Sequence, residues 1–167
     1  MHNPDSYDKI RSENTVRVQR MKIYEITENK KKYFDLLLLA DEQEDMIDRY
    51  LDRGKMYVLE DDGVKCECVV TDEGNGLLEI KNIATDPAHQ KKGYAKALID
   101  FICREYKGRY AVLQAGTGDS PLTVPFYEKL GFVRSHIIPD FFTKHYDHPI
   151  YECGVLLKDM VYFKKTL

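Results

Sequence analysis

A segment with two lysines and a glycine, Gln90–Ala95, has the residue types that hold an anion. The sequence predicts a strand before it, Leu77–Thr85, and a helix after it, Lys96–Tyr106. Backbone N–H groups in the first turn of a helix have no partner within the helix, and the aligned peptide dipoles add about half a positive charge there. Gly93 lets the backbone approach a guest closely. Three lysines add formal charge: Lys91, Lys92 and Lys96. The segment therefore predicts a phosphate-binding site.

Taken alone, the segment is also compatible with a solvated lysine cluster on a loop. It is not the G-x-G-x-x-G fingerprint of dinucleotide-binding proteins. Its interpretation depends on the motifs around it.

Two motifs follow one another along the chain. The first is Asn82–Pro87 with Gln90–Leu98, and the second is Phe126–Phe132, which reads Phe-Tyr-Glu-Lys-Leu-Gly-Phe. The first resembles the pyrophosphate-binding motif Q/R-x-x-G-x-G/A of the GNAT superfamily of acetyl-coenzyme A dependent N-acetyltransferases. The second resembles the later helix-and-turn signature of that family, in the same order. The resemblance covers about Met21–Leu167, and the tail that begins at Asp140 is similar to that of a bacterial subgroup.

The resemblance implies acetyl-coenzyme A as cosubstrate. Its pyrophosphate would lie at the lysine-rich segment, and its pantetheine arm would enter a gap between two splayed strands. Backbone N–H groups near Ile83 and Thr85 would polarise the acetyl carbonyl. The cofactor-binding residues inferred in this way are Ile83, Ala84, Thr85, Gln90, Lys91, Lys92, Gly93, Tyr94, Ala95 and Lys96.

Amine acetylation also requires that an ammonium lose a proton and that the departing thiolate gain one. Tyr127 matches the family's tyrosine by position, and a phenol with an unperturbed pKa near 10 can donate a proton to the sulfur. The alternative is a tyrosine packed in the core, as the adjacent Phe126 would be.

Glu79 is the candidate general base, because several family members carry a carboxylate on the strand before the phosphate site. The alternative is a simple pair with Lys81, two residues along on the same nominal face. No cysteine occupies the junction between this strand and the phosphate site, which favours direct attack in a ternary complex over an acetyl-enzyme.

Histidines and aspartates gather near the C-terminal loop, but their spacing matches no common zinc pattern, and no metal is expected. They are His136, His145, His148, Asp140 and Asp147. With the aromatic residues of 139–149 they are expected to shape the acceptor pocket. His145 and His148 are further candidates for proton transfer.

These residues need a scaffold, and 167 residues suffice for one domain with a substantial core. The net charge of −3 gives no sign of nucleic-acid binding, and no apolar run approaches the roughly 20 residues that span a bilayer. A cytoplasmic protein with four free thiols, buried or half-buried, is expected.

Residues 1–20 are polar and predict a flexible arm before a single domain at 21–167. The expected fold is α/β, or α+β in some schemes: a mixed, mostly antiparallel sheet of six to seven strands, with helices on both faces. A strand, helix, strand crossover predicts that Leu77–Thr85 and Tyr110–Ala115 run parallel. The other expected elements are strands Met21–Ile26, Met56–Glu60, Val64–Thr71 and Phe132–Ile138, a helical region Lys30–Leu51, loops Gly116–Ser120 and Pro139–Pro149, a helix from about Thr123, and at least one strand within Ile150–Phe163.

The resemblance thus predicts transfer of the acetyl group to a primary amine, more readily on a small molecule than on a protein. An acidic helix face within 41–48 would attract a cationic amine, unless it is only a solvated surface. Two alternatives stay open: a coenzyme A-binding sensor with little catalysis, and an acetyltransferase for protein N-termini or lysines. A homodimer is compatible with the edge strands expected at both ends of such a sheet.

Overall fold

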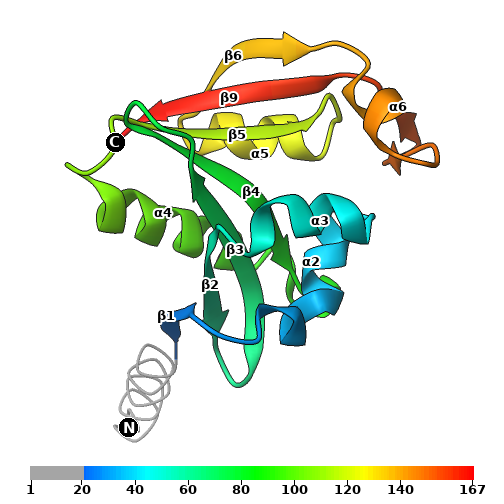
Figure 1. Cartoon of the computed structure of the whole chain (residues 1–167). Helices are drawn as coiled ribbons and strands as arrows, with labels where there is room; N and C mark the ends of the chain where they lie inside the picture. Colours follow the sequence, from blue (N-terminus) through cyan, green and yellow to red (C-terminus); the bar gives the residue numbers. More distant parts are fainter. Residues whose placement is uncertain (1–20) are drawn as a thin grey trace, which may run out of the picture.

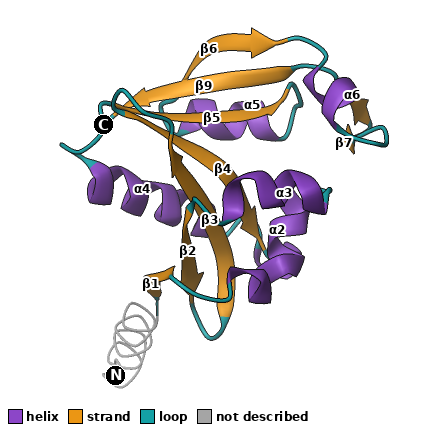
Figure 2. Cartoon of the chain, viewed as in Figure 1, coloured by secondary structure: helices purple, strands orange, loops and turns teal. Residues whose placement is uncertain are grey.

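The computed structural model describes residues 21–167, so the predicted flexible arm at 1–20 lies outside the described residues. The chain forms a seven-stranded sheet of order β1-β2-β3-β4-β5-β9-β6 with helices packed on it (Figures 1 and 2). The main elements are β1 (Lys22–Ile26), η1 (Lys30–Tyr33), α2 (Phe34–Ala40), α3 (Glu44–Leu51), β2 (Lys55–Glu60), β3 (Val64–Asp72), β4 (Leu77–Thr85), η2 (Pro87–His89), α4 (Tyr94–Tyr106), β5 (Val112–Gly118), α5 (Thr123–Lys129), β6 (Val133–Ile138), α6 (Phe141–His145), β7 (Tyr151–Glu152), β8 (Val155–Leu156) and β9 (Met160–Thr166).

The sheet confirms the predicted mixed architecture. β1 to β4 form an antiparallel meander, β4 and β5 run parallel, and β9 returns antiparallel between β5 and β6. The parallel step follows from α4, which crosses from the end of β4 to the start of β5.

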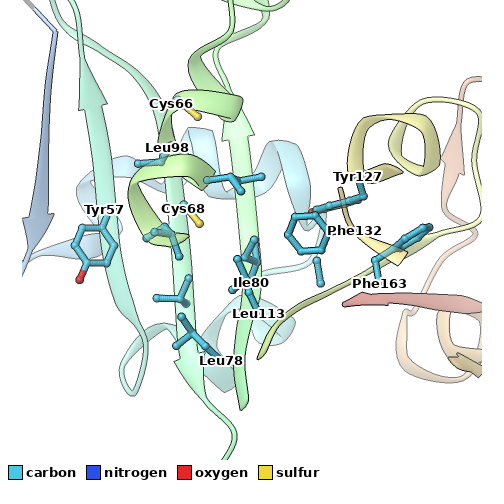
Figure 3. Close-up of a cluster of buried hydrophobic side chains, with 14 of the residues drawn as sticks. Tyr57, Cys66, Cys68, Leu78, Ile80, Leu98, Leu113, Tyr127, Phe132 and Phe163 are labelled. Atoms are coloured by element: carbon cyan, nitrogen blue, oxygen red, sulfur yellow. The ribbon is translucent and has the colours of Figure 1, made fainter. Parts of the chain in front are cut away.

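Alternating side chains divide the sheet into two cores. On β3, Cys66, Cys68 and Val70 face α4 and α5, and form a cluster with Leu98 and Ile102 of α4 (Figure 3). On the other face, a second cluster includes Met56, Val58 and Val69 and packs against α2 and α3. Burial on both faces explains the continuous apolar run 56–59 of β2. β3 is buried on both faces as well, although it includes the charged residue Glu67.

The structure corrects several predicted boundaries. α4 begins at Tyr94, two residues before the predicted start. β5 begins at Val112 and continues through Gly118, so part of the predicted loop Gly116–Ser120 is strand. Gly116 and Gly118 leave room for neighbouring side chains that pack over them. A Cβ on Gly118 would lie 2.5 Å from the Leu157 side chain.

The C-terminal region also differs from the prediction. The predicted loop 139–149 contains a short helix, α6, and a β7–β8 hairpin turns at Gly154. Cys153 at the tip of that hairpin is exposed, unlike the buried or half-buried thiols that the sequence predicted. The other three cysteines are free and are buried or half-buried as expected.

Candidate active site

β4 and β5 separate partway along their length. Their pairing ends at Ile80 opposite Ala115, although β4 continues to Thr85 and β5 to Gly118. Figure 1 shows the two strands together at one end and diverging toward the other. Lys81 is an extra residue opposite β3, because Val69 pairs with Asn82 while Val70 pairs with Ile80. Such a bulge bends a strand, and it lies where β4 leaves β5. We call this opening the fork.

The fork leaves one edge of β4 without a strand partner from Lys81 to Thr85 within the described residues. Unpaired N–H and C=O groups on such an edge can bind an extended ligand as a further strand would. This edge includes Ile83, Ala84 and Thr85, the positions where the sequence placed the thioester and the pantetheine arm.

Next along the chain, α4 follows directly on Gly93, its N-cap residue, which has φ +84°. No side chain among residues 21–167 caps this helix start, and no atom lies within 4 Å of the position that a Cβ on Gly93 would take. A phosphate group binds where the N–H groups of a helix start are uncapped and the space beside them is open. The start of α4, a helix of thirteen residues, has both features.

Polar and charged side chains surround this helix start. Gln90, Lys91 and Lys92 are exposed, and Gln90 Nε2 donates to the Thr85 carbonyl at 3.4 Å. Lys96 is also exposed and is paired with Asp100 at 2.5 Å, so it would have to leave that carboxylate to contact a phosphate. The hydroxyl of Tyr94 donates to Asp61 at 2.7 Å and ties the helix start to the β2–β3 turn.

Tyr127 projects from α5 into the core on the side of the sheet that α4 covers. Its ring stacks on Phe163 at 5.7 Å and contacts Phe132 edge-on at 5.4 Å (Figure 3). It is packed, as the alternative interpretation required, and it belongs to the same cluster as Ile80 and Ala115, where the fork opens. Burial is the main reason that the pKa of Tyr127 lies well above 10, and the negative charge of Glu152 raises it further. The phenol therefore stays protonated at neutral pH.

Glu79 lies on the paired part of β4, opposite Gln114 of β5, and is 6% exposed. One carboxylate oxygen accepts from Lys81 Nζ at 2.7 Å, and the other accepts from Gln114 Nε2 at 2.5 Å. The structure thus contains the Glu79–Lys81 pair that the sequence offered as the alternative to a catalytic base. Both oxygens retain lone pairs, so the pair does not prevent proton transfer.

The C-terminal segment 139–157, which we call the strap, lies across the open end of the fork. Its core is Phe142, Ile150 and Leu157. On one side, the Tyr146 hydroxyl donates to Asp41 Oδ1 at 2.8 Å in the α2–α3 connection. Asp41 also accepts from the hydroxyl of Tyr50 at 3.3 Å, and burial raises its pKa.

On its other side, the strap reaches the end of β5 through Glu152. This carboxylate accepts from the Ser120 hydroxyl and lies 3.4 Å from Thr123 Oγ1. Ser120 Oγ in turn accepts from the N–H groups of Leu122 and Thr123 at 3.2 and 3.4 Å. Sequence analysis did not single out Glu152, because the contact joins residues that are 32 positions apart.

The three histidines of the C-terminal region lie apart from one another. His136 stacks on Tyr162 at 4.5 Å, His145 contacts the Phe141 ring at 4.6 Å, and His148 is exposed next to Asp147 and Glu42. The hydrogen bond with Asp147 raises the pKa of His148 above its ordinary value. Within residues 21–167, no three His, Cys, Asp or Glu side chains group closely enough to hold a metal ion.

The comparisons with known proteins agree with this geometry. Residues 52–134 match the acetyltransferase (GNAT) domain. The chain is 36% identical over 149 residues to the uncharacterized N-acetyltransferase YvbK of Bacillus subtilis, covering 87% of this chain and 96% of that protein.

Two solved structures have the same fold. A GNAT family acetyltransferase from Elizabethkingia anophelis with acetyl-CoA bound superposes with a TM-score of 0.84 and 31% identity, over 89% of this chain and 99% of that one. A Bacillus subtilis acetyltransferase in complex with CoA superposes with a TM-score of 0.80 and 36% identity, over 88% of this chain and 99% of that one.

The chain therefore belongs to the GNAT family of acetyltransferases, and acetyl-coenzyme A is its cosubstrate. Its own residues fit that cofactor: an uncapped helix start with open space at Gly93, and a strand edge without a partner. No helix among the described residues is long and apolar enough to cross a membrane.

Proposed function

We propose that residues 21–167 form one catalytic domain that moves the acetyl group of acetyl-coenzyme A to a primary amine on a small molecule, by direct attack in a ternary complex. The observation that carries this proposal is the fork, with an uncapped helix start after one arm and Tyr127 beside it. Ten residues are proposed to bind the cofactor: Ile83, Ala84, Thr85, Gln90, Lys91, Lys92, Gly93, Tyr94, Ala95 and Lys96.

In the proposed reaction, the amine nitrogen attacks the acetyl carbon, the carbon–sulfur bond breaks, and coenzyme A leaves as a thiolate. Tyr127 donates its phenolic proton to that sulfur; its raised pKa keeps the phenol protonated until the thiolate forms, but it also makes the phenol a weaker acid. Glu79 accepts the ammonium proton through water. Proton exchange with solvent then restores both residues.

A small acceptor is favoured over a protein because the strap crosses the open end of the fork. It is fastened to the α2–α3 connection by Tyr146 and to the start of α5 by Glu152. These two contacts, on opposite sides of the fork, narrow the opening through which a polypeptide would have to enter. Acetylation of peptides at rates that match those of small amines would instead favour the protein acetyltransferase alternative.

The cofactor-sensor alternative predicts that the protein binds coenzyme A compounds but does not transfer the acetyl group to an amine. Thermal unfolding with acetyl-coenzyme A, desulfo-coenzyme A and ATP would test binding, since a ligand of the folded state stabilises it by about 2.7 kcal/mol at one hundred times its dissociation constant. A primary-amine screen with free-thiol detection would then test turnover. Binding of both coenzyme A compounds with no amine-dependent thiol release would favour the sensor.

A homodimer remains part of the proposal. The sheet ends in β6, whose residues are all exposed, including Val133 (70%) and Ile137 (54%). An exposed apolar edge strand is a common pairing surface. Light scattering after size exclusion would decide, because a single species at the 19.5 kDa of the chain would rule the dimer out.

A further inference from the structure

Three carboxylates lie around the fork, and they differ in their burial and in their hydrogen-bond and ion-pair partners. Glu79 is paired with Lys81, and Asp41 is 9% exposed and accepts from two tyrosine hydroxyls. Glu152 is only partly buried, and its partners among the described residues are the hydroxyls of Ser120 and Thr123. Of the three, Glu152 alone combines access to solvent with the absence of a cationic partner among the described residues.

The position of Glu152 places its charge on the Tyr127 side of the fork. Thr123 and Tyr127 are four residues apart on α5, so they lie on the same face of that helix. Glu152, 3.4 Å from Thr123 Oγ1, is therefore the carboxylate on that side, and its charge raises the pKa of the Tyr127 phenol further than burial does alone. Glu79 instead acts on Tyr162, which is on β9.

The contacts of Glu152 also fix its orientation. Backbone N–H groups of Leu122 and Thr123 donate to Ser120 Oγ, so the single proton of that hydroxyl is directed to Glu152 Oε2. The other oxygen, Oε1, has no hydrogen-bond partner among residues 21–167. One oxygen is thus held while the other is available to a ligand.

We propose that Glu152 is the residue that binds the ammonium group of the acceptor, which assigns the acceptor to the class of amines that are cationic at neutral pH. This inference rests on the proposed N-acetyltransferase function. The carboxylate holds the ammonium next to the Tyr127 hydroxyl, where the thiolate is released, and loss of the ammonium proton through water frees the nitrogen for attack. The strap thereby brings a specificity residue to the reacting atoms.

The test compares three variants of the full chain with wild type: Glu152→Gln, Glu152→Asp and, as a control, Glu128→Gln. Glu128 lies next to Tyr127 in sequence, is exposed and is 3.8 Å from Arg134. The probes are butylamine, 1,4-diaminobutane and 2-phenylethylamine with acetyl-coenzyme A. KM for each amine, KM for acetyl-coenzyme A and the unfolding temperature are measured.

Glu152→Gln preserves the size of the side chain and still accepts the Ser120 hydroxyl, but it lacks the charge. We expect it to raise KM for the amines at least about tenfold, as loss of a hydrogen bond to a charged group does, with KM for acetyl-coenzyme A unchanged. Glu152→Asp keeps the charge and should stay closer to wild type than Glu152→Gln does. Glu128→Gln should match wild type.

A purely structural role for Glu152 predicts the reverse order, because glutamine preserves the contact with Ser120 and the shorter aspartate loses it. That order, or unchanged amine KM values in Glu152→Gln, would overturn the inference and leave the proposed function intact. If wild type accelerates the acetylation of none of the three amines, the proposed function in its small-amine form fails, and this inference fails with it.

Discussion

Gly93 has a backbone conformation that an L-residue adopts only under strain, and the space beside it is open. We predict that Gly93→Ala destabilises the fold by about 1 kcal/mol, because φ is positive there, and also weakens acetyl-coenzyme A binding, because its methyl group enters the phosphate site. Gly108 supplies a matched control at the other end of α4, with φ +78° and no atom within 4 Å of its Cβ position.

Gly108→Ala should lose a similar amount of stability and bind acetyl-coenzyme A as wild type does. Denaturant unfolding gives the stability, and isothermal calorimetry gives the dissociation constants. Equal affinities in the two variants would mean that the helix start does not hold the pyrophosphate.

Tyr127 is the residue whose two interpretations, core and catalytic, both agree with its surroundings. If its hydroxyl protonates the thiolate, Tyr127→Phe should lower kcat roughly 10²-fold, while coenzyme A binding persists because the ring packing with Phe163 is retained. The control is Tyr57→Phe, which removes a buried hydroxyl bonded to Tyr106 at 2.9 Å.

Tyr57→Phe should cost about 1 kcal/mol of stability and leave kcat unchanged, since Tyr57 packs beneath α4 with Phe101. Steady-state kinetics and calorimetry on both variants separate the two roles. Full activity in Tyr127→Phe would reduce Tyr127 to a core residue.

At the scale of elements, the strap depends on a few polar contacts. Tyr146→Phe removes a hydroxyl from Asp41 and leaves this mostly buried carboxyl with one tyrosine donor. We expect faster hydrogen exchange in α6, by an amount that corresponds to about 1–3 kcal/mol of local stability. The amides of α4 serve as the internal reference and should exchange as in wild type. Unchanged exchange in α6 would show that its apolar core alone holds the strap.

The sequence predicted element boundaries correctly where they depend on residues adjacent in the chain. β4 has the predicted bounds, Leu77–Thr85, because a Gly-rich turn precedes it and Asp86-Pro87 follows it. α5 begins at Thr123 because Pro125 fits only the first turn of a helix. Where contacts are distant in sequence, the prediction was wrong or silent: glycines in β5 suggested a loop, but they make room for Leu157 and Tyr162. Glu152 meets Ser120 only because the strap folds back.

At the scale of the whole molecule, one buried carboxyl should govern how stability varies with pH. Glu67 on β3 is fully buried, and neither carboxylate oxygen has a hydrogen-bond partner in the described part of the chain. Burial raises its pKa from 4.5 to about 8. Between these two values the unfolded chain releases the proton and the folded protein keeps it, so the free energy of unfolding falls as pH rises.

The fall attributable to Glu67 is on the order of 4 kcal/mol between pH 4.5 and 8. Glu67→Gln, which is neutral at every pH, should therefore unfold at a less pH-dependent temperature across this range, and its advantage over wild type should grow toward pH 8. Asp41 has the same sign, because burial raises its pKa as well, so it leaves a smaller residual slope in both proteins. Glu73 and Asp86 have lowered pKa values and contribute stability that is lost only below about pH 4.5, outside this window.

Glu105→Gln is the surface control, since Glu105 is half exposed and pairs with Arg109, which lies just beyond the end of α4. Calorimetric scans of the three proteins from pH 5 to 8.5 provide the test. If wild type and Glu67→Gln lose stability in parallel, Glu67 ionises in the folded state at its ordinary pKa, which requires water or a cation beside its carboxylate. In that case the α2–α3 face of β3 would be open to solvent near the fork, and the acceptor could reach deeper than the strap.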